Sequence, residues 1–414
     1  MKKIILLVLL STISLFANAN DTIRFTWQVG TEQWKLAEIG IAKGETYTVR
    51  WGDGTSDTTT FIAFADTRMW HRYADTGRYD VIVTAECLVT GFYCIEEQLT
   101  ILDVSGCTNL EWLYCENNQL TALDVSGCVA LEVLYCYDNQ LTALDVNGCM
   151  NLVRLNCCNN QLTALEANDC TALELLSCAD NQLTTLDVSG CTNLEWLYCE
   201  NNQLTALNMG ENTCYRSIIC ENNRLLLSYL FAASQKINNP CNKIFGTQNL
   251  FPLTVMIGDE IDYSDQHIFG GMPTFFDVNK NDSLASENDY SITEGKITFH
   301  RSGNYIVIMT NWAVVSNPYA PPAQVIVEIE VLPDSTDGIV EPTKENFTVY
   351  PNPTTGQLTI ENVELFDIYG KSVLRHCERS EAIQKIDASH LENGIYFMKI
   401  TTDKGMSVKK IIKL

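Results

Sequence analysis

The middle third of the sequence repeats itself every twenty-one residues. The stretch LDVSGCTNLEWLYCENNQLTAL occurs twice, letter for letter, at residues 102–123 and 186–207. An asparagine recurs at the same spacing from Asn118 to Asn223. A chain with this period folds into stacked coils, because one coil cannot bury its own leucines whereas neighbouring coils bury a continuous core. Coils are interchangeable parts of such a stack, so a duplicated coil still fits.

The repeating unit reads L-x-x-L-x-C-x-x-N-x-L-x-x-L-D-V-S-G-C and resembles the leucine-rich repeat. The resemblance implies short strands at L-x-C that pair about 4.8 Å apart from coil to coil, and asparagines that bind backbone groups at a turn. Such short units leave little room for a helix, so we expect a second extended segment at L-D-V-S. An amphipathic helix over residues 225–235 is expected to cap the stack. The predicted fold is mainly β, a solenoid with its cap over residues 88–245, flanked by β-sandwich domains.

Twelve of the seventeen cysteines follow the same period. Their side chains run parallel in a column, which disfavours disulfide geometry, and zinc or iron–sulfur ligands must converge on a point. We therefore expect two ladders of buried free thiols that act as small hydrophobic side chains. Cys87, Cys158, Cys214 and Cys241 lie outside these columns, and some of them could pair. The two columns are Cys94, Cys115, Cys136, Cys157, Cys178, Cys199 and Cys220, and Cys107, Cys128, Cys149, Cys170 and Cys191.

Alternation along each strand indicates which residues face outward. If Leu113 and Cys115 point into the core, their neighbours project from the concave sheet. Exposed aromatic residues on a rigid sheet are typical of protein-binding hot spots, and they also stack on sugars. The alternative is that these residues merely cover a sheet to which they are suited. The candidate ligand-binding residues are Tyr93, Trp112, Tyr114, Glu116, Tyr135, Tyr137, Arg154, Trp196, Tyr198 and Glu200.

The segment before the repeats, residues 20–87, carries two turn motifs. Trp51-Gly52-Asp53-Gly54 precedes HRYADTGRYDV at residues 71–81, and together they resemble the PKD domain, a small β-sandwich. The first motif lacks the Phe-Gly of that family. Asp53 and Asp57 could bind calcium, but a structural role in the turn is the favoured interpretation. His71 is expected to pack at the hairpin.

Residues 246–333 contain short alternating runs separated by turn residues, which predict a second, Ig-like β-sandwich. We find no chemistry-bearing motif in this domain. A polar linker follows at residues 334–346.

The last segment, residues 347–414, contains VYPNPTTG, LFDIYGK, GIYFMKI and a terminal KKIIKL in that order. It resembles the C-terminal sorting domain of the type IX secretion system of Bacteroidota, which implies contact with that machinery, export across the outer membrane and removal of the domain. The charged segment RHCERSEAIQ at residues 375–384 departs from strand alternation. At the other end, Lys2 and Lys3, an apolar run over residues 4–16 and Ala17-Asn18-Ala19 predict a signal peptide over residues 1–19. No later run is long enough to span a membrane.

Composition and motifs exclude several functions. The net charge of −24 disfavours a partner made of nucleic acid. No nucleophile elbow, zincin motif or P-loop is present, so we expect no enzyme activity, no cofactor and no metal. The sequence therefore predicts a secreted or surface-attached binding or adhesion protein that contacts a protein, with an extracellular carbohydrate-binding protein as the alternative. It does not specify the ligand.

Overall fold

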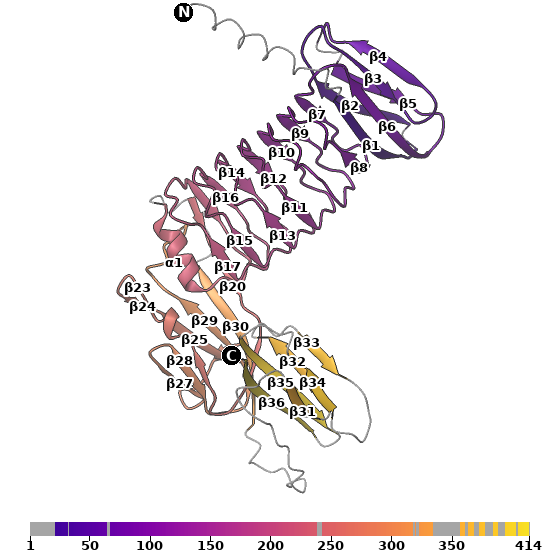
Figure 1. Cartoon of the computed structure of the whole chain (residues 1–414). Helices are drawn as coiled ribbons and strands as arrows, with labels where there is room; N and C mark the ends of the chain where they lie inside the picture. The colour runs from indigo at the N-terminus through magenta and orange to yellow at the C-terminus, as the bar shows by residue number, and fades with distance from the viewer. Residues whose placement is uncertain are drawn as a thin grey trace, which may run out of the picture.

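The structure is a computed structural model. It describes residues 21–31, 33–63, 67–237, 242–317, 319 and 323–333, and the backbone of six strands between residues 357 and 413. The predicted signal peptide, the linker and Cys241 lie outside the described residues. Figure 1 shows a solenoid with one domain at its N-terminal end, in indigo, and another at its C-terminal end, in orange.

The solenoid is built on parallel strands of three residues. Each strand pairs with the strand twenty-one residues further along, so that Leu113 lies beside Leu134, and Leu134 beside Leu155. These leucines are fully buried. The predicted strand in each coil is therefore confirmed. The strands are β9 (Trp112–Tyr114), β10 (Val133–Tyr135), β12 (Arg154–Asn156), β14 (Leu175–Ser177), β16 (Trp196–Tyr198) and β18 (Ser217–Ile219).

A second extended segment occurs on the other side of the coils, at the predicted L-D-V-S position. Leu144 pairs with Leu165, and Leu186 pairs with Leu207, in two small parallel sheets. The prediction of a strand rather than a helix in this place is confirmed. The strands are β11 (Ala143–Asp145), β13 (Ala164–Glu166), β15 (Thr185–Asp187) and β17 (Ala206–Asn208).

A buried asparagine joins each coil to the one before it. The Asn160 amide nitrogen donates to the carbonyl oxygen of Cys136 in the preceding coil at 3.0 Å, and to those of Cys157 and Cys158 in its own coil. Its side-chain oxygen accepts a hydrogen bond from the Leu141 amide at 2.9 Å. The same pattern recurs at Asn118, Asn139, Asn181, Asn202 and Asn223. This asparagine ladder satisfies backbone groups that burial would otherwise leave unpaired.

Both cysteine columns lie in the core. The first column is at most 1% exposed. In the second, thiols donate to the preceding coil, as Cys170 does to the Val146 carbonyl at 3.4 Å. Burial raises the thiol pKa, to about 12 for Cys128. Every described cysteine is a free thiol, and Cys158 bonds the Ser177 hydroxyl at 2.9 Å rather than another cysteine.

The N-terminal domain consists of two sheets that meet in one core. Rings of Phe25 and Phe92 from opposite sheets lie 5.4 Å apart, and the Trp27 indole N–H donates to the Tyr73 hydroxyl. The first sheet has the order β4-β3-β6-β1-β8, and the second contains β5, β2 and β7. Resemblance to a PKD domain stays a prediction. The strands are β1 (Thr22–Val29), β2 (Trp34–Gly40), β3 (Thr46–Arg50), β4 (Ser56–Thr60), β5 (Arg68–Arg72), β6 (Gly77–Ala85), β7 (Gly91–Tyr93) and β8 (Leu99–Asp103).

The N-terminal domain and the solenoid share a sheet. Strand β7 pairs antiparallel with β2 of the domain and parallel with β9 of the solenoid. The result is a ten-stranded sheet of order β19-β18-β16-β14-β12-β10-β9-β7-β2-β5. Strand β8, which belongs to the first coil, pairs antiparallel with β1 of the N-terminal domain. Hydrogen bonding thus crosses the predicted domain boundary at residue 87.

Gln248 supplies the last rung of the ladder at the other end of the solenoid. Its oxygen accepts from the Leu225 amide at 3.1 Å, and its nitrogen donates to the Cys220 and Phe245 carbonyls. It is fully buried. The predicted helix is present as α1 (Leu227–Gln235), followed by β19 (Lys243–Ile244) and β20 (Thr247–Asn249). The ladder therefore continues three residues beyond the end predicted for the solenoid.

The C-terminal domain continues from β20. That strand pairs with β30 in a sheet of order β20-β30-β29-β25-β26, with β21 also on β30. A three-stranded sheet, β22-β28-β27, and the hairpin β23-β24 complete it. Its Ig-like assignment stays a prediction. The strands are β21 (Leu253–Met256), β22 (Glu260–Asp262), β23 (Ile268–Phe269), β24 (Met272–Pro273), β25 (Phe275–Lys280), β26 (Ser283–Leu284), β27 (Tyr290–Thr293), β28 (Lys296–Phe299), β29 (Gly303–Thr310) and β30 (Gln324–Leu332).

The final segment is described only as strand backbone. One sheet has the order β33-β32-β35-β36, and β31 pairs with β34. Most of the charged segment at 375–384 lies outside the described residues. The strands are β31 (Gln357–Ile360), β32 (Val363–Asp367), β33 (Ser372–His376), β34 (Gln384–Asp387), β35 (Gly394–Thr402) and β36 (Gly405–Lys413).

Replacing one ladder asparagine should destabilise the protein strongly. Asn160→Ala leaves the buried Leu141 amide without its side-chain partner, and the Cys136 carbonyl keeps only the Asn139 side chain of its two asparagine donors. We therefore expect a loss of about 3 kcal/mol in the free energy of unfolding. Chemical denaturation measures it. Asn109→Ala, whose amide bonds an exposed hydroxyl on Thr108, is the control and should cost less than about 0.5 kcal/mol. Equal losses would show that the ladder contributes little.

The cysteine columns should react with a thiol reagent only after unfolding. Burial and a raised pKa protect them, whereas Cys214 is exposed. In the folded protein at mildly alkaline pH we expect a fast phase that Cys214→Ser reduces by one thiol. The remaining thiols should become reactive in denaturant without reductant. Few free thiols after unfolding would contradict the free-thiol assignment.

Candidate functional site

The outward face of the ten-stranded sheet carries a row of three tyrosines. Tyr93, Tyr114 and Tyr135 occupy equivalent positions on β7, β9 and β10, directly in register. Ring centroids are 4.9 Å apart for the first pair, nearly parallel, and 5.0 Å apart for the second, edge to face. All three are half-buried. The row is a rigid aromatic surface, because neighbouring strands fix the spacing of its rings.

Three further predicted residues extend this surface. Trp112 is half-buried and projects from the same face two residues before Tyr114. Tyr137 continues from Tyr135, with ring centroids 6.4 Å apart. Arg154 is exposed and lies beside Val133 on the neighbouring strand. With Glu116, seven of the ten predicted residues gather on the N-terminal half of the sheet.

Trp196 and Tyr198 form a separate group near the other end. Leu175, beside Trp196, and Ser177, beside Tyr198, separate them from the tyrosine row. Trp196 is partly covered, since the Arg216 guanidinium lies 5.4 Å from its ring centroid. The aromatic positions predicted as one site are thus two groups, which repeat because the coil was duplicated.

Glu116 does not project into solvent, and the expectation that it does is wrong. Its side chain is 5% exposed and bonds its own backbone amide, next to the turn at Asn117, which has φ 55°. Burial raises the pKa of Glu116 and of Glu200 in the twin coil. One carboxyl oxygen of each is buried without a hydrogen-bond partner among the described residues. Both carboxyls therefore favour the protonated form more than a free glutamate does.

Two exposed tryptophans of the N-terminal domain lie on the same sheet and were missed. Trp34 on β2 and Trp70 on β5 are 56% and 54% exposed. Sequence alternation around Trp34 signals an outward position, but nothing in the sequence indicates that β2 and β5 continue the solenoid sheet.

The turn of the N-terminal domain uses both candidate calcium ligands as hydrogen-bond acceptors. Asp53 accepts from the Thr55 amide at 2.9 Å and lies 2.8 Å from the His71 ring nitrogen, while Asp57 accepts from the Trp51 indole at 2.7 Å. His71 stacks on Trp51, as expected for packing at the hairpin. Within the described residues no group of three or more potential metal ligands occurs.

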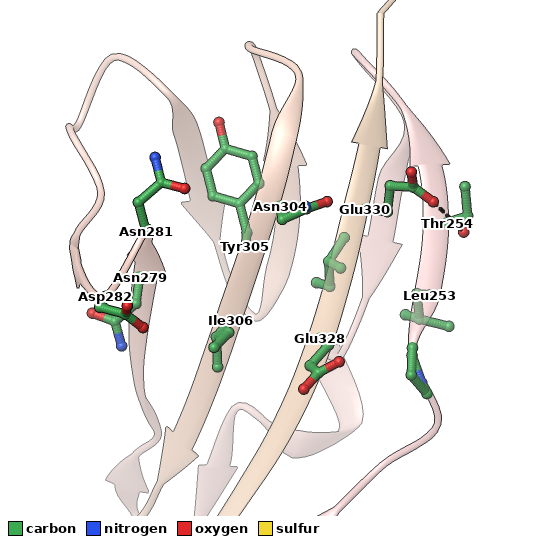
Figure 2. A pocket seen from close by; sticks show the side chains of 12 residues that line it. Leu253, Thr254, Asn279, Asn281, Asp282, Asn304, Tyr305, Ile306, Glu328 and Glu330 are labelled. Carbon is green, nitrogen blue, oxygen red and sulfur yellow. Dashed lines mark hydrogen bonds between the residues drawn. The ribbon is translucent and has the colours of Figure 1, made fainter.

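A pocket of about 450 Å³ lies on the C-terminal domain, in which no chemistry-bearing motif was found. Figure 2 shows Asn304 and Ile306 on one strand beside Glu328 and Glu330 on the next. Thr254 donates to Glu330 across its rim at 3.4 Å. Apart from Ile306, these are outward polar positions of an open sheet. The aromatic face remains the stronger candidate.

Family comparisons match two parts of the chain. Residues 348–414 match the family described as Secretion system C-terminal sorting domain, and residues 108–149 match Leucine Rich repeats (2 copies). The first match places the chain among proteins exported by type IX secretion to the cell surface or the extracellular space. Neither family is an enzyme family. None of the helices in the described part is long and apolar enough to cross a membrane.

Several solved structures share local similarity with the chain. The functional domain of InlJ from Listeria monocytogenes, described as including a cysteine ladder, is 22% identical over 59% of this chain and 67% of its own, with a TM-score of 0.24. InlP from the same organism is 18% identical over 55% and 68%, with a TM-score of 0.37. YopM from Yersinia pestis is 30% identical over 28% and 33%, with a TM-score of 0.27. Thus the match spans about a third of YopM. Among curated proteins, none matches the chain.

Removing the buried charge at Glu116 should change how stability depends on pH. Its pKa is raised on folding, so the folded state holds the proton more tightly, and stability is lost as pH rises above the unfolded value of about 4.3. The Gln side chain cannot ionise, so Glu116→Gln avoids this loss. The difference in melting temperature, variant minus wild type, should therefore become more positive between about pH 4 and pH 7. The exposed Glu132→Gln is the control. A pH-independent difference would show that Glu116 is not destabilised by burial.

Proposed function

We propose that this exported protein binds another protein through the outward face of its ten-stranded sheet. The observation that carries the proposal is the in-register row of Tyr93, Tyr114 and Tyr135, with Trp112 beside it. Tyrosine and tryptophan are enriched at binding hot spots because they bury a large area and retain a polar group. An adhesion role at the cell surface is part of the proposal.

The rigidity of the face supports this function. Each strand of the tyrosine row is held on both sides by a paired neighbour, parallel in every case except that of β7 with β2, and the asparagine ladder fixes the turn that follows it. A preformed surface loses little conformational entropy when it binds, so more of the contact energy appears as affinity. The aromatic rings need no rearrangement to be presented.

A carbohydrate ligand is the second candidate. The rings of Tyr93 and Tyr114 stack on each other, inclined by 17° with centroids 4.9 Å apart, so a ligand meets their edges rather than a flat face. The half-buried Trp112 beside them supplies the aromatic ring on which a sugar can stack. The same residues serve both candidates, so the nature of the ligand distinguishes them.

The sorting domain supports an extracellular place for this binding. Its match covers residues 348–414, beyond the described solenoid and its flanking domains. We propose that the signal peptide predicted at residues 1–19 starts export, and that the sorting domain is removed afterwards. The Bacteroidota origin belongs to the same proposal.

A paired substitution tests the site. The exported chain and the variant Trp112→Ala/Tyr114→Ala are screened against arrays of extracellular proteins and of glycans. We expect a protein ligand whose binding falls at least roughly tenfold in the variant, as removal of hot-spot aromatics does elsewhere. The matched control is Trp196→Ala/Tyr198→Ala, which makes the same change in the identical coil.

Each result of this screen has a distinct meaning. Loss in the first variant alone supports the tyrosine row as the site. Loss confined to glycans favours the second candidate. Binding that survives in both variants would contradict the proposal and place the site on another face.

A further inference from the structure

We propose that the N-terminal domain forms half of the binding face, and that its Trp34 and Trp70 contact the same partner as the tyrosine row. The partner this surface fits is a protein with an apolar strip flanked by carboxylates. The inference rests on the proposed function and extends it to a domain that the repeat does not include.

Continuous strand pairing places the N-terminal domain and the tyrosine row on one surface. Glu38 of β2 lies opposite Tyr93 of β7, which lies beside Tyr114 of β9. Side chains alternate along β2, so that Trp34, Leu36 and Glu38 share the outward side while the residues between them are buried. Strand β5 joins this face with Trp70 opposite Leu36. No domain interface interrupts the sheet, so its two halves keep a fixed spacing.

Among the described residues of the domain, exposed aromatic side chains occur on this side and not on the other. Trp34 and Trp70 keep more than half of their surface in contact with solvent. Strands β3 and β4 on the opposite sheet instead pair threonines, with Thr48 and Thr58 hydroxyls 2.9 Å apart. The other two tryptophans of the domain, Trp27 and Trp51, are buried in its core. An exposed aromatic pair confined to one face is a mark of an interaction surface.

Two arginines give the face its charge complementarity. Arg72 lies 5.9 Å from the Trp34 ring centroid, and Arg154 lies at the far side of the tyrosine row. Both are exposed, and among the described residues neither has a carboxylate within 4 Å. The chain has 51 acidic and 27 basic residues, so arginines without an acidic partner stand out. They are available to carboxylates of a partner.

The dimensions agree with a protein partner. Five strand spacings separate β5 from β12, which is about 24 Å across the strands. A standard interface covers about 800 Å² on each partner, equivalent to a square of about 28 Å. The face from Arg72 to Arg154 therefore comes close to one edge of such an interface. Its solenoid strands are only three residues long, so the turns beside them must supply the rest of the contact area.

Selection from a protein library tests this inference. A displayed library of a small folded domain with randomised surface positions is selected against the full exported chain. The selected binders are measured against Trp34→Ala/Trp70→Ala, Trp112→Ala/Tyr114→Ala, Arg72→Ala/Arg154→Ala and the control Trp196→Ala/Tyr198→Ala. Thermal unfolding checks that each variant is folded. We expect this of Trp34→Ala/Trp70→Ala because both tryptophans are exposed.

The proposal predicts that the first three variants each lose at least roughly tenfold in affinity and that the control changes less than about twofold. Binders should be rich in Asp and Glu and should weaken at high salt. Binders that lose affinity for Trp112→Ala/Tyr114→Ala but not for Trp34→Ala/Trp70→Ala would overturn this inference and leave the proposed function standing. Binders that keep their affinity for all three variants, or a selection that yields no binder, would overturn the inference and the proposed function alike. Unchanged affinity for the arginine variant would overturn the proposal that the partner is acidic.

Discussion

Each coil of the solenoid is held to the one before it by a buried asparagine that bonds the backbone of both. Asn139 donates to carbonyls of Cys115 and Cys136 and accepts from the Leu120 amide. A coil of twenty-one residues has no helix in which to satisfy its backbone groups, so this bond and the strand pairing must satisfy them. Each coil must keep its length of twenty-one residues for successive asparagines to remain aligned. The columns of leucine, cysteine and tyrosine all follow from that register.

A stack of coils also has two ends that need a partner. This chain closes both by continuing hydrogen bonding into a neighbouring domain rather than by ending the sheet. At one end β7 joins β2, and at the other Gln248 occupies the place of the ladder asparagine. Sheet edges are sites of unwanted pairing, and continuity removes them within the solenoid. It also makes the outward face longer than the repeat.

The coils could be predicted from sequence because their information is local and repeated. Leu113 and Cys115 have equivalents in coil after coil, so alternation and period agree on which residues are buried. The face could be predicted in part for the same reason. Glu116 was misplaced because it follows the strand, where the turn at Asn117 ends simple alternation. Trp34 and Gln248 were missed because their roles depend on contacts with segments distant in sequence. Gln248 does not recur at the spacing of the repeat, and no local sequence pattern indicates that β2 pairs with β7.

Hydrogen exchange on the exported chain, alone and with a selected protein binder, would locate the bound surface. If one rigid face from β5 through β12 binds the partner, the binder should add protection along β2, β7, β9 and β10, with little change elsewhere. Protection confined to the C-terminal domain, or to the opposite side of the coils at β11 and β13, would contradict it.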